Sequence, residues 1–446
     1  MILLSSHTIL IFYTYYLIKN FKLKNSIQTR MVIKVLAIGD VGNTIRTLQK
    51  LVKKSEIHLI NYPRDGSAFF VNVDDVKLFK TRKVREQVKR INEIKDDYDI
   101  CLTTASERIA YLADLNYIAY YLGRDIDVPM FKKNSTEEWA TEPLHKLNFF
   151  ERKFYWNAFK NAVVHIAGKW QFEYLSKYTK NAINSSRDPI DPDEFNPNIK
   201  PIERKKSKFT FFSPLRLDKS KGSDLLWEAI KLCKSDFEVI GVDWFEEATE
   251  ESKKFKKKLL NEMPSQIKLI PIIKRSEIAR YYTYADAVIA NLFIGAHELV
   301  SLESVMCGTP VIQYTDHKIK IIANETEIKS PFLPFSNAPK SIADVIDKVV
   351  ESKQFRQKLF EDEYQFVNEV ADPVKCAEWW DNLFEDLVKK HKSIRKNSSP
   401  FRIKLRMIGF LIANRLYLQK IKKLIINSDY QKIGQELYDN PPQTSS

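Results

Sequence analysis

Residues 32–43 of the chain read VIKVLAIGDVGN, and this stretch decides the fold. Val32–Gly39 is a β-branched and apolar run of the kind that forms a buried parallel strand. A tight loop follows at 40–43, and apolar residues then recur at helical spacing, at Ile45, Leu48, Leu51 and Val52. A buried strand, a short loop and an amphipathic helix in this order predict the start of a doubly wound α/β domain.

The same alternation continues along the chain in two series. In the first, strands are predicted at 57–61, 100–104, 117–122 and 163–167, with helices near 82–94, 107–114 and 170–178. In the second, strands are predicted at 209–213, 237–241, 267–270, 287–291 and 311–314, with helices at 223–233, 247–262, 276–284 and 298–306 and more helices over 340–390. Two such halves predict a ligand site between the facing carboxyl ends of two sheets.

The proline-punctuated stretch Asp188–Pro201 marks the join between the two series. The predicted organisation is an extension at 1–30, a first Rossmann-like domain at 31–187, a linker at 188–205, a second Rossmann-like domain at 206–371, a helix at 372–390 and a basic tail at 391–446. The expected fold class is therefore α/β, with two Rossmann-like domains and a basic C-terminal helical tail.

The net charge of +14 over 446 residues is concentrated at the two ends of the chain. Residues 1–30 hold four bases and no acid, 389–423 hold twelve bases and no acid, and 424–446 hold one base and three acids; the remaining 31–388 have 54 of each. A neutral core argues against nucleic-acid binding.

The four cysteines form no C-x-x-C pair, so a zinc site or a disulfide framework is not expected. We expect Cys101 and Cys307 to be buried and the body of the protein to be cytoplasmic.

Residues 2–18 form an uncharged, mostly apolar run at the short limit of a membrane span. Two interpretations stay open: an N-terminal membrane anchor, or an extension from an over-early start codon before Met31.

The C-terminal stretch 389–423 mixes its bases with apolar residues and contains no run long enough to span a bilayer. We expect it to lie on an anionic membrane surface, with a disordered tail, a protein-docking segment or RNA contact as alternatives.

Two motifs in the second half indicate phosphate chemistry. A helix is predicted to open near Glu298, after a loop that contains Gly295, and a helix start offers unpaired N–H groups to an anion. Glu303 lies about one turn into this helix, where a carboxylate can accept hydrogen bonds from a sugar diol, and Gly308-Thr309-Pro310 ends it. Arg216 and Lys221 lie five residues apart in a strand-to-helix loop, so they can clamp a diphosphate from the opposite side.

In this order and spacing the segments resemble the retaining glycosyltransferases of the GT-B fold, specifically glycosyltransferase family 4. The linker Asp188–Pro197 resembles the family's N-P-x-D-x-x-x-F-x-P pattern, Arg216 to Gly222 its R-x-x-x-x-K-G loop, and Glu303 to Val311 the end of its donor motif. In the first half, Gly39–Asn43 looks like the acceptor-side loop and Gly123-Arg124-Asp125 like the family's G-S-D segment.

The resemblance implies a role for each matching residue. Arg216 and Lys221 would bind the donor diphosphate, Glu303 would hold the ribose hydroxyls, and the backbone amides near Leu299, Val300 and Ser301 would cap the phosphates. On the acceptor side stand Gly42, Asn43, Arg124 and Asp125. The implied reaction moves a hexose from a nucleoside diphosphate sugar, with retention, to a cell-envelope, lipid-linked or polysaccharide acceptor. It needs no cofactor, and no metal is expected because the two cations supply the positive charge.

The sequence departs from the family pattern at two places. Position 295, eight residues before Glu303, is glycine where the family usually has a glutamate that faces the donor sugar. The family's usual first-domain histidine is missing near 104–106. Glu298 or His297 are candidates to compensate in catalysis, although a histidine at a helix start is more often structural. These departures leave open a weak or inactive nucleotide-sugar-binding scaffold protein.

Overall fold

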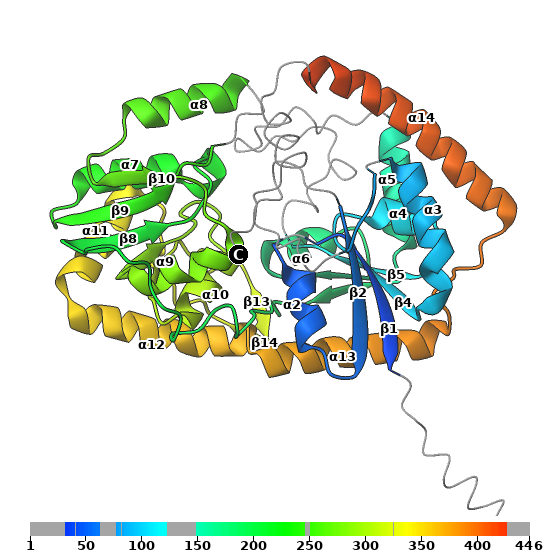
Figure 1. Cartoon of the computed structure of the whole chain (residues 1–446), viewed down its shortest axis with the longest axis horizontal. Helices are drawn as coiled ribbons and strands as arrows, with labels where there is room; N and C mark the ends of the chain where they lie inside the picture. The colour runs from blue at the N-terminus through cyan, green and yellow to red at the C-terminus, as the bar shows by residue number, and fades with distance from the viewer. Residues whose placement is uncertain are drawn as a thin grey trace, which may run out of the picture.

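The computed structural model describes residues 32–40, 42–62, 77–81, 83–122, 149–245, 250–323 and 325–425. These residues form two α/β lobes joined along one edge (Figure 1). The chain crosses between the lobes through the linker that begins near Asp188 and again through two long helices at the bottom of the view.

The first lobe is built on a seven-stranded parallel sheet with the order β3-β2-β1-β4-β5-β6-β7. The strands are β1 (Ile33–Ile38), β2 (Ser55–Asn61), β3 (Lys77–Leu78), β4 (Ile100–Thr103), β5 (Tyr117–Tyr120), β6 (Val164–Ala167) and β7 (Ala182–Asn184). The helices that cover it are α2 (Thr44–Leu51), α3 (Val84–Ile94), α4 (Glu107–Leu112), α5 (Phe149–Asn161) and α6 (Lys169–Leu175). The register of β1 against β2 and β4 places the loop after β1 at the carboxyl edge of the sheet.

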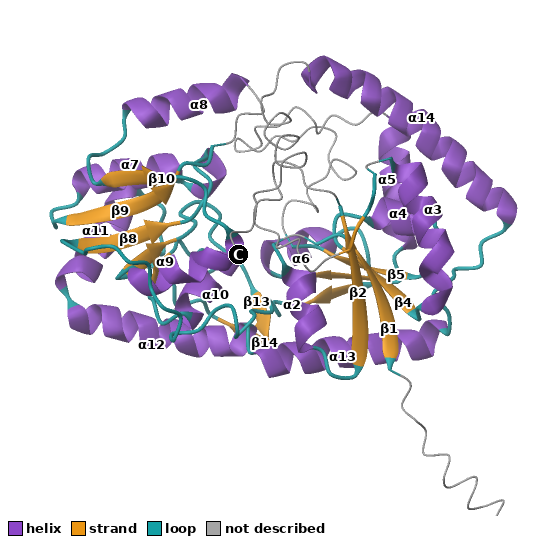
Figure 2. Cartoon of the chain, in the orientation of Figure 1, coloured by secondary structure: helices purple, strands orange, loops and turns teal. Residues whose placement is uncertain are grey.

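The second lobe has a five-stranded parallel sheet with the order β10-β9-β8-β11-β12 (Figure 2). Its strands are β8 (Phe209–Ser213), β9 (Phe237–Val242), β10 (Ile267–Ile270), β11 (Ala287–Ile289) and β12 (Val311–Ile312). Its helices are α7 (Ser223–Leu232), α8 (Glu250–Asn261), α9 (Ile278–Tyr284), α10 (Leu299–Met306), α11 (Pro339–Glu351) and α12 (Lys353–Val370). A small antiparallel hairpin of β13 (Ile321–Ala323) and β14 (Thr326–Ile328) follows β12.

The predicted fold class is confirmed, since both sheets are parallel and each has its own buried core. Cys101 and Cys307 are buried, as expected, and no two of the four cysteines are bonded. Helix α5 was not predicted: its aromatic residues lie on more than one side, so that the segment lacks a single apolar stripe. Phe154 and Phe159 face the core, whereas Phe149 and Phe150 are exposed.

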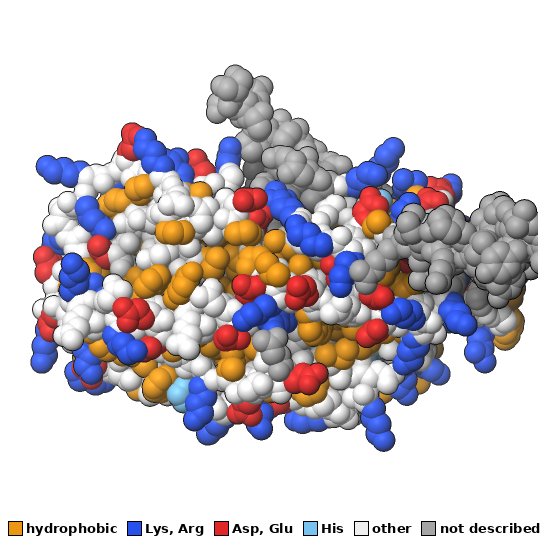
Figure 3. Space-filling view, turned by 90° about the horizontal axis from the view of Figure 1, so that it is seen from below, with side chains coloured by type: hydrophobic (Ala, Val, Ile, Leu, Met, Phe, Trp, Pro, Cys, Tyr) orange, Lys and Arg blue, Asp and Glu red, His pale blue; other side chains and the backbone are white. Residues whose placement is uncertain are grey.

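Helix α13 (Pro373–His391) runs from the second lobe back along the first (Figure 1). Its residues Trp380, Phe384 and Leu387 are buried against β1, β2 and α2 in the first lobe's core. The Asp381 carboxylate accepts hydrogen bonds from the amides of Lys53 and Lys54, at 2.8 and 2.9 Å. The face along which α12 and α13 run carries interspersed side chains of both charges (Figure 3).

The two crossings between the lobes meet at one place, at the end of α12. The Asp188 amide donates to the carbonyl of Val370 at 3.3 Å, and Arg187 Nη1 donates to the carbonyl of Glu369 at 2.7 Å. The linker is also tied to α2 of the first lobe, because Arg46 Nη1 lies 2.5 Å from Glu194 Oε1 and Lys50 pairs with Asp191. This junction fixes the linker to both lobes.

Helix α14 (Pro400–Ile425) lies across α5 on the outside of the first lobe (Figure 1). Phe410 and Ala413 are buried there, and the rings of Phe410 and Phe154 have centroids 5.6 Å apart. The helix turns out not to be a free tail but part of the first lobe's core. Over the ranges given above, no helix is long and apolar enough to cross a membrane. The predicted anchor at 1–30 lies outside those ranges.

Candidate active site

The loop after β8 presents Arg216 and Lys221 at the carboxyl edge of the second sheet. Asp218 organises this loop: its carboxylate accepts from the amide of Lys221 at 3.0 Å and from Ser220 Oγ at 2.6 Å. The same carboxylate pairs with Arg216 Nε, and the Arg216 guanidinium lies 5.8 Å from the centre of the Trp244 ring. The turn therefore holds both cations in defined positions before any ligand arrives.

Lys221 faces Glu298 across the carboxyl edge. Its Nζ lies 2.6 and 2.8 Å from the two carboxylate oxygens of Glu298. Asn291, which follows β11, donates from Nδ2 to Glu298 Oε1 at 3.0 Å and to the carbonyl of Ser220 at 3.2 Å. Both side chains of the ion pair are roughly one-fifth exposed, so a solute can reach them.

Glu298 is also the residue that precedes the first turn of α10. The amides of Ser301 and Leu302 donate to its carbonyl, whereas those of Leu299 and Val300 belong to the open start of the helix. An anion at this point would meet amide donors, the positive end of the helix dipole and Lys221 together. Residues that are far apart in the sequence thus lie together at the start of α10, and we call this group the α10 site: Arg216, Lys221, Asn291, Glu298 and the amides of Leu299 and Val300.

The loop after β1 in the first lobe approaches the α10 site. A Cβ atom added at Gly42 would lie 3.0 Å from Leu299 Cδ1, so the backbone of Gly42 is in contact with the first residue of α10. Asn43 is buried and adopts a left-handed conformation with φ of 64° at the start of α2. The structure thus brings two predicted acceptor-side residues next to the predicted donor side. The other two, Arg124 and Asp125, lie outside the described residues.

Asp40 shapes that same loop. Its two carboxylate oxygens accept from the amides of Ile45 and Arg46, each at 3.0 Å. Burial raises the pKa of Asp40 to about 6, and the amide hydrogen bonds to Ile45 and Arg46 only partly oppose this shift. The carboxyl group binds the first amides of α2 and fixes the loop after β1 to the start of that helix.

Gly295 has a steric reason to be glycine. Its φ is +79°, and an added Cβ would lie 2.8 Å from Asp316 Cβ and 3.1 Å from the Asp316 amide nitrogen. The Gly295 carbonyl accepts from that amide at 2.9 Å, which fixes the loop to the segment after β12. A glutamate at this position would not fit the loop as it stands.

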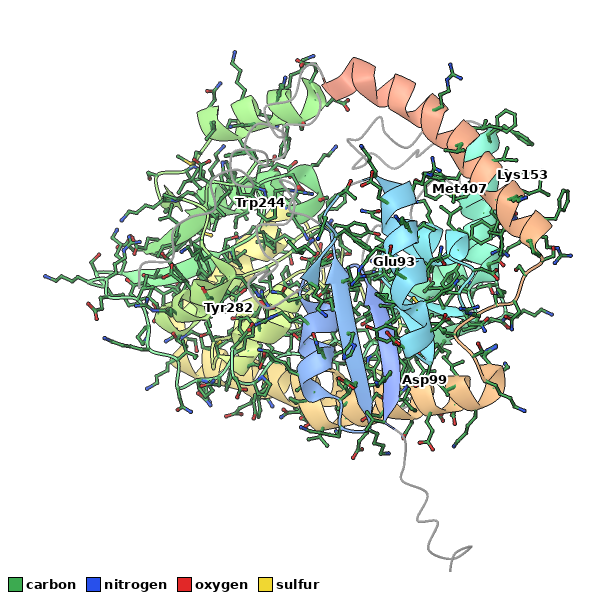
Figure 4. The ribbon with its side chains drawn as sticks, turned by 45° about the vertical axis from the view of Figure 1, so that its right-hand side comes forward. Glu93, Asp99, Lys153, Trp244, Tyr282 and Met407 are labelled. Atoms are coloured by element: carbon green, nitrogen blue, oxygen red, sulfur yellow. The ribbon has the colours of Figure 1, made fainter. Side chains whose placement is uncertain are left out.

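Glu303 is only 1% exposed and has partners for both oxygens. Arg275 holds it through two guanidinium nitrogens, one of them 2.9 Å from Oε2, and the Tyr282 hydroxyl donates to Oε2 at 3.3 Å. Arg275 also stacks over Phe195 of the linker at 4.6 Å. Tyr282, labelled in the second lobe in Figure 4, is itself fully buried, so this group lies in the core of that lobe. Ribose binding by Glu303 stays a prediction, and it requires Arg275 to share the carboxylate.

His297 is fully buried and belongs to a link between the lobes. Its Nε2 lies 3.1 Å from Asp188 Oδ2, which also pairs with Lys169 Nζ at 2.7 Å; that ammonium donates in addition to the carbonyl of His297 at 3.0 Å. Burial and the nearby Lys169 lower the pKa of His297 to about 4, so the ring is neutral at pH 7. Burial opposes ionisation of Asp188, but Lys169 and His297 lower its pKa well below the usual range.

Of the two candidates to compensate for Gly295, the structure therefore places only Glu298 at the α10 site. Sequence reasoning missed Arg275, Asn291, Trp244 and Lys169, which hold the predicted residues in place. Asn291, Trp244 and Lys169 each lie two residues after a strand, namely β11, β9 and β6, and could have been found from that position. Arg275 lies five residues after β10 and carries no such signal. Among the described residues, no three His, Cys, Asp or Glu side chains are grouped as a metal site would require.

Comparison with known proteins identifies the class. Residues 195–366, which contain the whole α10 site, match the model of the family glycosyl transferases group 1. This part of the chain is similar to that family, and the chain as a whole has the GT-B fold. A search of the curated proteins finds no match.

Solved structures share the whole two-lobed architecture at low sequence identity. A sucrose-phosphate synthase from Thermosynechococcus elongatus is 14% identical with a TM-score of 0.58, covering 80% of this chain and 100% of its own. The Anabaena protein HepE, solved with UDP and glucose, is 14% identical with a TM-score of 0.53, over 79% and 100% of the two chains. An α-glucosyltransferase solved with UDP is 12% identical with a TM-score of 0.56, again over 79% and 100%. These likenesses establish the fold.

Proposed function

We propose that the protein is a retaining glycosyltransferase that moves a hexose from a nucleoside diphosphate sugar to a cell-envelope, lipid-linked or polysaccharide acceptor. The observation that carries the proposal is the position of Lys221 beside the start of α10, in reach of a solute and opposite Gly42. A departing diphosphate there would be stabilised by Lys221, Arg216 and helix amides that are already oriented.

Glu298 has the role of the sugar-facing glutamate that the family usually has at position 295, where this chain has glycine. Its carboxylate is held by Lys221 and Asn291 at the same edge of the sheet, so a sugar joined to the diphosphate would lie against it. The acceptor would enter past Gly42 and Asn43. The two cations provide the charge that a divalent metal would otherwise supply, and we propose that the reaction needs neither a metal nor a cofactor.

We also propose that the protein works at the cytoplasmic face of a membrane, where lipid-linked acceptors are presented. Support comes from the basic and apolar composition of 389–423.

UDP in the α-glucosyltransferase and HepE structures makes uridine nucleotides the first donors to test.

The test is a thermal-shift screen of UDP- and GDP-sugars, followed by transfer of labelled sugar to cell-extract acceptors. Lys221→Ala should abolish the nucleotide shift and reduce transfer by on the order of 100-fold, as loss of one preorganised charge does. Lys231→Ala, an exposed lysine on α7, serves as the matched control and should change neither. Equal transfer by Lys221→Ala and wild type would refute the site.

Glu298→Gln separates an enzyme from a scaffold. If Glu298 faces the sugar, the variant should keep the nucleotide shift but lose transfer. Wild-type protein that binds a nucleotide sugar without ever turning it over would instead support the non-catalytic scaffold.

A further inference from the structure

The outer face of α14 is a strip of exposed apolar side chains. Phe401, Leu405, Ile408 and Ile412 follow one another at intervals of four, three and four residues, which places them on one side of a helix. All four are exposed, Phe401 to 70%. The opposite side, with Met407, Phe410 and Ala413, packs on the first lobe. The helix is therefore apolar on two opposite sides, and within the described part of the chain only one of them is covered.

A second apolar group lies at the start of the neighbouring helix α5. Phe149 and Phe150 pack against each other with ring centroids 5.5 Å apart, and Phe149 is 70% exposed. Lys153 lies 5.9 Å above the Phe149 ring. Figure 4 labels Lys153 on α5 and Met407 on α14, where the two helices lie against each other. We call the strip on α14 together with Phe149 and Phe150 the outer face.

The charged residues around the outer face indicate which kind of partner binds to it. The segment 389–423 contains no acid, and Arg402, Lys404 and Arg415 are exposed on α14 beside the strip. Other bases of the segment already have partners inside the protein: Lys389 pairs with Glu385, Arg395 with Asp96 and Arg406 with Asp114. Lys390 and Lys392, near the end of α13, are exposed as well. On α14 itself, Arg402, Lys404 and Arg415 are exposed beside the apolar strip, which is the arrangement of a helix lying at a lipid interface.

We infer that the outer face docks on an anionic lipid bilayer, with the apolar strip inserted between headgroups and its bordering cations on the lipid phosphates. A second copy of the chain fits less well, since a self-contact would bring cations of the same sign together. This inference deepens the proposed membrane location by naming the surface that makes the contact, and it does not rest on the proposed sugar transfer. It also moves the membrane contact from the basic tail as a whole to one side of one helix and the start of α5.

The test is flotation of the full chain with vesicles of phosphatidylcholine and phosphatidylserine, and with phosphatidylcholine alone. The triple variant Leu405→Gln, Ile408→Gln and Ile412→Gln should weaken binding to the mixed vesicles by roughly tenfold or more, since each side chain loses apolar insertion. The control variant Leu232→Gln, Leu260→Gln and Val374→Gln removes three exposed apolar side chains from other helices and should bind as wild type does. Because all six positions are exposed, both variants should fold.

Reversing the border charges, with Arg402→Glu and Lys404→Glu, should remove the preference for vesicles that contain phosphatidylserine. Equal flotation of the strip variant and wild type would overturn the inference, as would a wild-type chain that binds neither kind of vesicle. A dimer of the wild-type chain in light scattering that the strip variant abolishes, without vesicle binding, would overturn it in favour of self-association.

Discussion

Gly295 shows how one residue decides which side chain can serve the site. Replacing it with glutamate to match the family should not increase transfer, because φ is +79° and Asp316 occupies the space. We expect Gly295→Glu to lower stability by at least about 1 kcal/mol from the backbone conformation alone. Thermal unfolding and the transfer assay check this. Gly409→Glu, where an added Cβ meets nothing within 4 Å, is the matched control and should not destabilise. A Gly295→Glu enzyme that is stable and faster than wild type would contradict the assignment of Glu298.

His297 should make the protein sensitive to mild acid. Its pKa is about 4 in the folded protein and near 6.5 in an unfolded chain, so the unfolded state binds a proton first as the pH falls. The free energy of unfolding should drop by about 1–3 kcal/mol between pH 7 and pH 4 from this residue. His165, with a pKa also lowered to about 4 by burial, adds a similar dependence.

His297→Gln should flatten the stability curve over that range without removing the contribution of His165. Urea unfolding at several pH values measures the difference between the two proteins. Asp188 acts in the same direction at lower pH: its lowered pKa stabilises the fold above about pH 4 and this stabilisation is lost on further acidification. Parallel curves for the variant and wild type would show that the histidine is not buried as a neutral ring.

At the scale of the element, α14 has two faces that should respond differently to truncation of a side chain. Phe410→Ala should destabilise the first lobe by about 3 kcal/mol, because the ring is buried against Phe154. Ile408→Ala, two positions earlier and exposed, should change stability by less than about 0.5 kcal/mol. Thermal unfolding of both variants tests this; a similar loss from each would mean that α14 packs with another rotation.

The elements that could be predicted are those that carry their own signal. Buried β-branched strands such as β1 and β9 and the amphipathic helices α2 and α7 were found near their observed limits. α5 and α14 could not be read reliably, because both have apolar residues on more than one side. The cause is tertiary: one side of each packs on the lobe and another remains exposed, so no single helical stripe appears in the sequence.

Across the whole molecule, order and spacing predicted which segments carry the site but not how their side chains are paired. Arg216, Lys221 and Glu298 meet at one sheet edge because the carboxyl ends of parallel strands lie together, and this is general. The pairing of Glu303 with Arg275 depends on a contact between two segments with no shared pattern. The same is true of His297, whose partners Asp188 and Lys169 come from the linker and the other lobe. Long-range pairings of this kind are fixed by the packed fold rather than by local sequence.

The meeting of both chain crossings at the end of α12 has a mechanical consequence. Two lobes joined along a single line can rotate about that line, whereas sliding would break the hydrogen bonds that the Asp188 amide and the Arg187 side chain make to the end of α12. Atoms near that axis, including the His297 ring, move little during such a rotation. Gly42 and Leu299, which are in contact across the two lobes, would separate as the angle between the lobes increases. A bulkier bound substrate would therefore hold the lobes at a larger angle.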